Sequence, residues 1–530
     1  MTHLLVLCAV VLVQTCYSGN VLVIAGLQGS HLYVSTDVAE KIAGFGHNVT
    51  LLTLRNDSRV NIMDRGFHFV AFGKEGPKME SFLKRWDNAF KHFIHHPSDD
   101  MIVEFMRVNV QVEEVLEWGN DFKDMSLDYF QGEEFSELLN TGKFDLIVLE
   151  DSASFEAMVP LSRQDIPIMG IYCVPAISDA RDRLNLPGLA NSEPRMFNDV
   201  TDSSPTFSER FKNVIRKSRL LLYIIQAIQA LEVDVGIEEL FIAIYDVAFV
   251  LDHSSYSFPF ISPPNTFYLG PFNLQDLPLS PLPIDYHEFI ANCPHKNIVF
   301  FSFGSYLVDI ATFRGTPAII QTLQQLDACV IMKSQVDLSP KFDLPAKKFL
   351  QKAWVPQKDL LGSGKLAFFI SHCGNNGRME AIFYGVPLLC IPLFGDQYFN
   401  ARLVERNKFG LLHKWEELTE SSLMQTVKKL LEEKETFVTN MKKATEIATN
   451  DPGAGIGALK FYTDLLIRNG NADHLTNRVI LNQSINEIYD LDIVVMFFVI
   501  LLGFIVGSCY CFMKCLKFCY RKIMTKRKIE

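Results

Sequence analysis

Short apolar runs, each followed by a glycine-rich or polar turn, recur along the chain and predict the strands of parallel sheets. Val21–Ala25, Val49–Leu54 and Phe144–Leu149 stand in the first half, and Asn297–Ser302 and Leu366–Ile370 in the second. Runs of this length without polar alternation are typical of strands that are buried on both faces. Segments with helical spacing separate them, so the pattern indicates βαβ units and an α/β fold.

A break in this pattern divides the chain into two domains. Residues 256–290 are rich in Pro and lack a strong period, as expected of a linker. We therefore expect an N-terminal domain over residues 19–255 and a C-terminal domain over residues 291–450. The chain has 530 residues, of which 48% are hydrophobic, and this is enough for two sizeable cores.

Both ends of the chain carry the features of a membrane protein. Residues 1–18 hold a short apolar core, as in a secretory signal peptide. Ile493–Met513 is a run of 21 residues without a charge, and at about 1.5 Å per residue it crosses the hydrocarbon core of a bilayer. Seven basic residues and one acid follow in 514–530, which predicts a single-pass type I protein with a cytoplasmic tail. Glycosylation sequons stand at Asn48, Asn56 and Asn482.

Charge and cysteine spacing argue against several kinds of site. The net charge of −11 disfavours a nucleic-acid partner. Between the leader and the C-terminal helix five cysteines remain, an odd number without close spacing, which predicts neither a disulfide framework nor a zinc site. We expect Cys373 to be buried as a small hydrophobe. His92, His95 and His96 lie at helical spacing, but no acid completes a metal set, so a solvated helix face is expected.

One stretch of the second half gathers the polar groups of an anion site. After a buried strand come the turn Ser371–Gly377 and a run with helical spacing over Arg378–Tyr384. A strand, a glycine turn and a helix start together direct backbone N–H groups and the positive end of a dipole at one point, which favours phosphate. His372 can add a donor, and Glu380, about two turns along the helix, can accept hydrogen bonds from sugar hydroxyls.

The next buried run, Leu388–Leu393, ends just before Asp396 and Gln397. Ligands of parallel sheets bind outside the carboxyl ends of the strands, so these two side chains are expected at the same edge.

This stretch resembles the nucleotide-binding signature of the UDP-glycosyltransferases, most closely the membrane-bound animal UDP-glucuronosyltransferases. The match runs without a gap from Trp354-Val355-Pro356-Gln357 to Asp396-Gln397, and it departs only at Cys373, where those enzymes usually have Gly. The resemblance implies that uracil stacks on Trp354 and is bonded by Gln357. It implies that Glu380 holds the ribose and that Asp396 with Gln397 holds the donor sugar. The diphosphate is then held by His372, Gly374, Asn376 and Gly377.

Two further loops fit the same family. Ser302-Phe303-Gly304-Ser305 ends a strand and is similar to the family's Ser-x-Gly-Ser loop, which brings backbone amides to phosphate. Lys333 follows the strand Val330–Met332, where the family more commonly has Arg, and is expected to face the donor phosphates.

The first domain supplies a candidate general base. His31 follows the first strand in a glycine-rich loop, and a neutral imidazole suits proton abstraction near pH 7. A carboxylate on its other nitrogen would stabilise the imidazolium. Glu150 and Asp151 both stand at the tip of the strand from Phe144; counting along the strand selects Glu150, whereas the residue type usual in the family selects Asp151, which we prefer narrowly.

The resemblance implies a GT-B fold of two Rossmann-like domains, with the acceptor on the first, the UDP-sugar on the second, and residues 451–492 running back toward the first. The favoured function is inverting, metal-independent transfer of glucuronate from UDP-glucuronate to a hydroxyl of a small lipophilic acceptor, a detoxifying conjugation without a cofactor. UDP-glucose as the donor, or a catalytically inactive UDP-sugar-binding membrane protein, is the alternative. Lys526 and Lys528 resemble a dilysine retrieval signal, so an endoplasmic reticulum membrane protein with lumenal domains is expected; a homo-oligomer is left open.

Overall fold

The computed structural model describes part of the chain, and everything below concerns that part. The described residues are 18–25, 29–53, 66–71, 130, 132–150, 161, 164–173, 245–257, 264–275, 278–304, 310, 313–393, 396–475 and 491–526. Residues 1–17 of the expected signal peptide and the three histidines of residues 92–96 lie outside them, as do the candidate site residues Asp151 and Ser305.

The first sheet has seven strands in the order β3-β2-β1-β4-β5-β6-β7, and every pairing in it is parallel. Its central strands are buried along almost their whole length, which explains their continuous apolar sequences. The strands are β1 (Asn20–Ile24), β2 (Asn48–Thr53), β3 (His68–Ala71), β4 (Leu146–Glu150), β5 (Ile168–Tyr172), β6 (Val247–Val250) and β7 (Thr266–Tyr268).

The second sheet has six strands in the order β10-β9-β8-β11-β12-β13, again all parallel. Strand β11 is buried at all six positions and lies between β8 and β12. The strands are β8 (Asn297–Ser302), β9 (Ala328–Lys333), β10 (Phe349–Lys352), β11 (Leu366–Ser371), β12 (Leu388–Cys390) and β13 (Gly410–Leu412).

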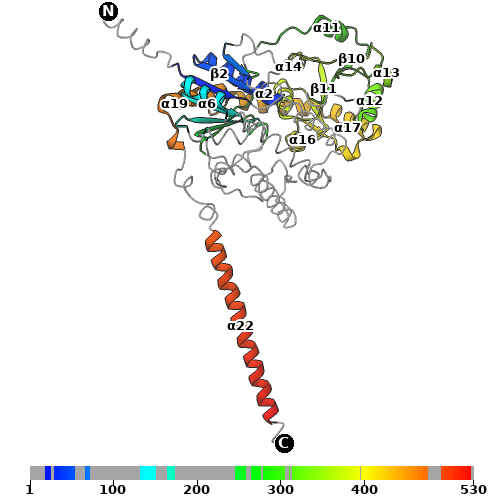
Figure 1. The fold of residues 1–530 in the computed structure, drawn as a ribbon. Helices are drawn as coiled ribbons and strands as arrows, with labels where there is room; N and C mark the ends of the chain where they lie inside the picture. The colour runs from blue at the N-terminus through cyan, green and yellow to red at the C-terminus, as the bar shows by residue number, and fades with distance from the viewer. Residues whose placement is uncertain are drawn as a thin grey trace, which may run out of the picture.

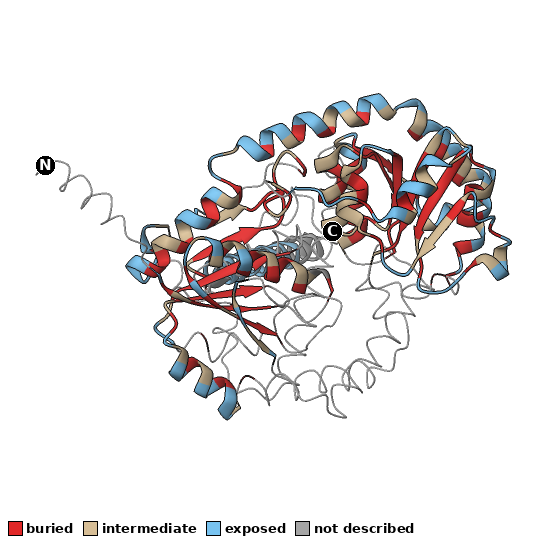
Figure 2. Cartoon of the chain, turned by 90° about the horizontal axis from the view of Figure 1, so that it is seen from above, coloured by how far each residue is buried: buried red, intermediate tan, exposed pale blue. Residues whose placement is uncertain are grey.

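Helices flank both sheets and turn their outer faces to solvent, while the strands form the buried layers (Figure 2). In the first half they are α2 (Ser30–Gly44) and α6 (Glu133–Gly142). In the second half they are α11 (Ile284–Ala291), α12 (Thr316–Gln325), α13 (Ser339–Phe342), α14 (Gln357–Gly362), α15 (Asn375–Tyr384), α16 (Asp396–Arg406), α17 (Glu420–Glu432), α18 (Lys434–Asn450) and α19 (Gly455–Asn469).

Helix α19 lies beside the first sheet although it follows the second in sequence (Figure 1). It contacts α2 and β4, and Asp464 Oδ1 lies 3.0 Å from Nε2 of the buried His47. The last described helix, α22 (Leu491–Lys526), projects away from both sheets (Figure 1). Its segment Ile493–Lys517 is long and apolar enough to cross a membrane, and none of its most apolar part is buried inside the protein.

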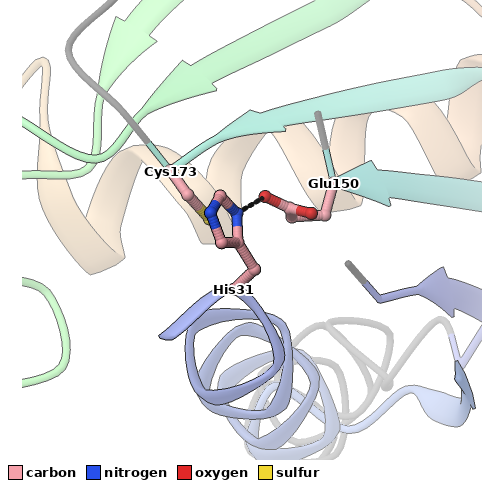
Figure 3. Close-up of side chains that lie close together, drawn as sticks. All are labelled: His31, Glu150 and Cys173. Atoms are coloured by element: carbon pink, nitrogen blue, oxygen red, sulfur yellow. Dashed lines mark hydrogen bonds and ion pairs between the residues drawn. The ribbon is translucent and has the colours of Figure 1, made fainter. Parts of the chain in front are cut away.

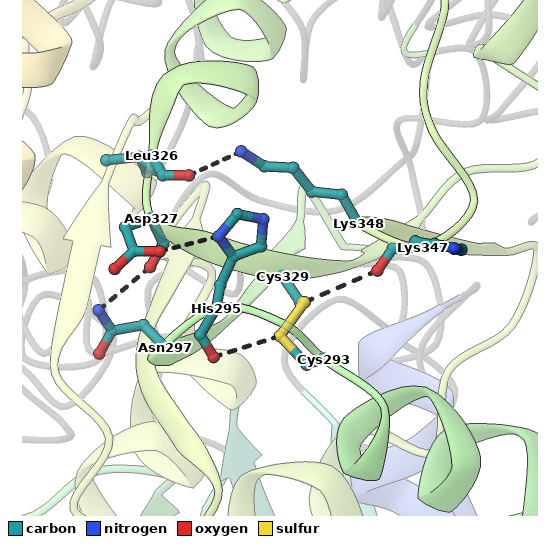
Figure 4. Close-up of a disulfide and its surroundings, with 8 residues drawn as sticks. All are labelled: Cys293, His295, Asn297, Leu326, Asp327, Cys329, Lys347 and Lys348. Atoms are coloured by element: carbon teal, nitrogen blue, oxygen red, sulfur yellow. Dashed lines mark hydrogen bonds and ion pairs between the residues drawn. A yellow bond between two sulfur atoms is a disulfide. The ribbon is translucent and has the colours of Figure 1, made fainter.

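Two disulfides contradict the expectation that the body of the protein has none. Cys293 bonds to Cys329 (Figure 4), and Cys373 bonds to Cys390, with Cα–Cα distances of 6.1 and 5.4 Å. Sequence spacing could not predict them, because it is the pairing of neighbouring strands that brings each pair of cysteines together. Strand β8 pairs with β9, and β11 pairs with β12. Cys373 is fully buried, as expected, but as half of a disulfide.

Candidate active site

The two sheets meet where their strands end. Asn375, the first residue of α15, donates from Nδ2 to the backbone oxygens of Cys173 and Leu251 at 2.9 and 2.7 Å. Those carbonyls directly follow β5 and β6 of the first sheet, whereas α15 follows β11 of the second. The start of α15 is therefore fixed against the carboxyl ends of strands from the other half of the chain.

A buried ion pair strengthens this contact. Arg378 on α15 and Asp252 just after β6 are both completely buried, and Arg378 Nη2 lies 3.0 Å from Asp252 Oδ1. The same guanidinium donates to the backbone oxygen of Tyr256 at 3.1 Å and to Asn375 Oδ1 at 2.7 Å. A buried charge is costly unless it is paired and hydrogen-bonded, so these contacts fix the position of Arg378. Because its partners come from the first half of the chain, Arg378 also fixes the two sheets relative to each other.

His31 and Glu150 form a close pair at the end of the first sheet. Nδ1 of His31 lies 2.6 Å from Oε1 of Glu150 (Figure 3). The imidazole is one-quarter exposed, whereas Glu150 is 1% exposed. A carboxylate on Nδ1 selects the tautomer with the proton on that nitrogen, which leaves the Nε2 lone pair as the basic one.

Glu150 is one of the two carboxylates that were expected as partners of His31. Strand β4 continues through Glu150, which pairs with Ile171 of β5. Glu150 makes the contact with His31, and Asp151 lies outside the described residues.

His372 lies between two glycines at the end of β11. A Cβ added to Gly304 or to Gly374 would come within 2.7 Å of His372 Nε2, so the ring fits only because both residues lack a side chain. Among the described residues its buried Nδ1 has no hydrogen-bond partner. Desolvation, with a contribution from the charge of Lys333, lowers the pKa of His372 to about 4. The ring is therefore neutral near pH 7 in this structure.

Serine hydroxyls accept hydrogen bonds from backbone amides in the two turns beside His372. Ser302 Oγ accepts from the N–H of Gly304 at 3.2 Å, and Ser371 Oγ accepts from the N–H of Cys373 at 3.0 Å. Gly304 has φ of +80° and Cys373 has φ of +60°, a conformation that favours Gly. This explains why the family usually has Gly where this chain has Cys373. Helix α15 begins directly after this turn, and the amides of its first turn have no acceptor within the helix.

The residues expected to hold uridine cluster beside this turn. Trp354 is 55% exposed, with Lys333 Nζ 4.7 Å from its ring centroid and the ring of Tyr33, on α2, at 6.4 Å. Gln357 Nε2 donates to Glu380 Oε2 at 2.6 Å. Desolvation raises the pKa of Glu380 to about 7, against the hydrogen bond from Gln357, which lowers it. Gln357 Nε2 and Glu380 Oε2 are thus hydrogen-bonded to each other in this structure.

The other signature residues lie in the first turns of α15 and α16. Gln357 Nε2 would be 3.5 Å from a Cβ on Gly377, so this glycine lies beside the Gln357–Glu380 pair. Asp396 starts α16 and accepts from Asn400 at 2.8 Å, and Gln397 accepts from the N–H of Leu393 at 2.9 Å. Desolvation raises the pKa of Asp396, while His31 lies close enough for its charge to lower that pKa. Asn376 is the second residue of α15.

Several functional contacts were not predicted. Asn375 and Arg378 lie inside the recognised signature, but no local pattern says that their partners come from residues 173 and 251–256. Cys173 has no local signal beyond its place in an odd set of cysteines. Tyr33 does have one, because it follows His31 by two residues on the same helix.

Solved structures define the class of fold. The structure of Phytolacca americana UGT2 complexed with UDP-2fluoro-glucose and pterostilbene has a TM-score of 0.57 and 14% identity, covering 85% of this chain and 100% of that one. The calicheamicin glycosyltransferase CalG4 has a TM-score of 0.57 and 16% identity, covering 86% and 99%. The two parallel sheets therefore confirm the expected GT-B fold of glycosyltransferases.

The sequence comparison gives the family within that class. The chain belongs to the family described as UDP-glucoronosyl and UDP-glucosyl transferase, whose model matches residues 19–529. It is 24% identical to mouse UDP-glucuronosyltransferase 3A1 over 97% of this chain and 96% of that protein. With human UDP-glucuronosyltransferase 3A2 it is 33% identical, but the match spans 48% of each chain. The protein is thus a glycosyltransferase of the UDP-glycosyltransferase type, as the signature indicated.

Proposed function

We propose that this protein transfers glucuronate from UDP-glucuronate to a hydroxyl of a small lipophilic acceptor, with inversion at the anomeric carbon. The observation that carries the proposal is the His31–Glu150 pair, whose Nδ1–Oε1 distance is 2.6 Å, at the sheet end that contacts α15. An imidazole in this tautomer, held by a buried carboxylate, has the chemistry of a general base.

The reaction begins at the acceptor. Nε2 of His31 accepts the proton of the acceptor hydroxyl as its oxygen attacks the anomeric carbon from the face opposite UDP. The resulting imidazolium is stabilised by Glu150, which is 1% exposed and therefore interacts strongly with a nearby positive charge. No covalent enzyme intermediate and no metal enter this step.

The leaving group is stabilised on the second sheet. The bond between the anomeric carbon and the β-phosphate oxygen breaks, and negative charge develops on UDP. The N–H groups at the start of α15, the turn at Gly304 and His372 are arranged to receive that charge. Binding of the diphosphate favours protonation of His372, because an anion opposes the desolvation that lowers its pKa.

The nucleoside and sugar take the remaining signature residues. Uracil stacks on the exposed ring of Trp354, which requires Lys333 to leave that face and turn toward the phosphates. The ribose hydroxyls take the place of Gln357 as partners of Glu380, and Gln357 is released to the uracil edge. Asp396 and Gln397 accept and donate to hydroxyls of the transferred sugar.

Glucose is the second candidate for the donor sugar. The family description names both glucuronosyl and glucosyl transfer, and the relatives 3A1 and 3A2 are named glucuronosyltransferases. Carboxylate and amide side chains such as those of Asp396 and Gln397 suit the hydroxyls of either sugar.

The same proposal includes the membrane setting. Helix α22 spans the endoplasmic reticulum membrane, with both sheets in the lumen and the basic tail in the cytoplasm. The two disulfides support this orientation, because disulfides persist in oxidising compartments. Apolar acceptors partition into a bilayer, so an anchored enzyme meets them at high local concentration.

The test is UDP release by the membrane-inserted protein with UDP-glucuronate or UDP-glucose and a panel of phenols and steroid-like alcohols. Acceptor-dependent release with UDP-glucuronate and a product of inverted anomeric configuration is expected. Release with UDP-glucose alone would establish the second candidate. Saturable UDP-sugar binding without release for any acceptor would favour an inactive binding protein.

A further inference from the structure

We propose that His31, Glu150 and Cys173 together form a binding site for a thiophilic divalent cation such as Zn²⁺. Each residue can offer one ligand atom, and these three atoms all lie within 4.8 Å of one another. Figure 3 shows the thiol of Cys173 beside the imidazole, on the side away from Glu150. This site was not anticipated from the sequence, because its residues come from α2, the end of β4 and the residue after β5.

The donor set suits zinc. A thiolate, an imidazole nitrogen and a carboxylate oxygen are the three ligand types that zinc takes in proteins, and three protein ligands leave a fourth position open. Bond lengths of about 2.0–2.3 Å place tetrahedral ligand atoms roughly 3–4 Å apart. Binding therefore requires the ligand atoms to close in from separations of up to 4.8 Å, with Cys173 Sγ turning toward the Nδ1–Oε1 side of the ring. The cation replaces the proton on His31 Nδ1, and the neutral imidazole then carries its proton on Nε2.

The charge balance also fits. Cys173 is 5% exposed and Glu150 is 1% exposed. A thiolate and a carboxylate in such surroundings carry two negative charges, which a divalent cation neutralises. Binding converts the thiol to a thiolate with release of a proton to solvent, so the affinity rises with pH.

Cys173 is held in position for this role. Its backbone oxygen accepts from Asn375, so the contact between the two sheets fixes the residue that brings the sulfur. In the described part of the body, the other cysteines form the two disulfides, and Cys173 is not disulfide-bonded. Its sulfur is a soft ligand beside the proposed base.

Occupancy of this site blocks transfer. A cation that takes a nitrogen of His31 and an oxygen of Glu150 removes the pair that accepts the acceptor's proton. The cation is therefore an inhibitor of the reaction under "Proposed function", and this consequence, unlike the binding itself, rests on that proposal.

The test uses the full chain in detergent and Co²⁺ as a spectroscopic substitute for Zn²⁺. Cys509, Cys511, Cys515 and Cys519 are first changed to Ser so that the thiols of the C-terminal helix cannot contribute. In this background Co²⁺ is expected to give the near-ultraviolet charge-transfer absorption of a thiolate ligand, and added Zn²⁺ is expected to abolish it. No transfer activity is needed for this measurement.

Three variants of this background identify the ligands. Cys173→Ser should remove the absorption, and Glu150→Gln should weaken Co²⁺ binding at least tenfold. His295→Ala should leave it unchanged, because His295 contacts another carboxylate, Asp327, at 2.8 Å (Figure 4), and it precedes β8 of the second sheet. Absence of the absorption in the background protein, its persistence in Cys173→Ser, or an unchanged affinity in Glu150→Gln would each overturn the proposal.

Discussion

The position of His372 depends on two residues that have no side chain. Gly304 and Gly374 both lie next to Nε2 and Cε1 of the His372 ring, and a Cβ on either would overlap with it. Gly374→Ala is therefore expected to displace His372 and to weaken UDP binding by tenfold or more, measured by calorimetric titration. Gly457→Ala on α19 is the matched control, because a Cβ there meets nothing within 4 Å. Equal UDP affinity in the two variants would contradict this role of Gly374.

Glu380 is expected to make the stability of the folded protein fall as the pH rises. Desolvation raises its pKa from 4.5 to about 7, so between these values the folded state holds a proton that the unfolded state releases. Its contribution to stability is present below pH 4.5 and declines as the pH rises toward 7. Glu380→Gln should flatten the fall of Tm between pH 5 and 7, and Glu432→Gln, at an exposed position of α17, should not. A Glu380→Gln variant with the pH profile of the wild type would rule out this assignment.

At the scale of elements, one disulfide joins the phosphate turn to the neighbouring strand. Cys373 has a left-handed conformation and is bonded to Cys390 at the end of β12. The Cys373→Ala/Cys390→Ala double variant should lose about 3 kcal/mol of stability in denaturant titrations and should also lose UDP affinity, because the turn is released.

The other disulfide provides the control. Cys293 and Cys329 lie 36 positions apart, against 17 for the first pair. Their replacement by Ala should cost a similar 3–4 kcal/mol with UDP affinity unchanged, because neither residue belongs to the signature. If both double variants lost UDP affinity equally, the effect would be one of general stability rather than of the turn.

The elements differ in how far the sequence predicts them. The buried strands were predicted closely because apolar runs and the turns after them are local patterns, and the strand from residue 366 is found at Leu366–Ser371. The disulfides were missed because they follow from which strands are neighbours. Residue type favours Asp151 as the partner of His31; in the structure Glu150, the last residue of β4, contacts His31, and Asp151 lies outside the described residues.

For the whole molecule, the buried pair of Arg378 and Asp252 holds the two halves together. The two side chains are fully buried, and their partners come from both sheets. Arg378→Met leaves Asp252 as a buried charge without its cation and should cost roughly 3–5 kcal/mol. Lys352→Met, which breaks an ion pair with Asp285 where both side chains are over one-third exposed, should cost at most about 1 kcal/mol. Similar losses in the two variants, measured by chemical denaturation, would contradict this role.

This contact also marks the limit of what the sequence predicts. The signature residues from Trp354 to Gln397 were identified from one continuous stretch, and the structure brings Trp354, Gln357, His372 and Glu380 close to one turn. The residues that align the first sheet with that turn are Asn375 and Arg378, and their partners are up to 202 positions away in sequence. Such pairing depends on the relative placement of two domains, which no periodicity or composition records.

The measurement that tests the central claim most directly is the transfer rate of His31→Ala alongside its donor affinity. Loss of the general base should lower kcat by roughly 10²–10⁴, while the dissociation constant of the UDP-sugar stays at the wild-type value. His295→Ala, which removes a histidine paired with the exposed carboxylate of Asp327, should change neither. A His31→Ala variant that transfers sugar to a hydroxyl acceptor at the wild-type rate, with normal donor binding, would contradict the account.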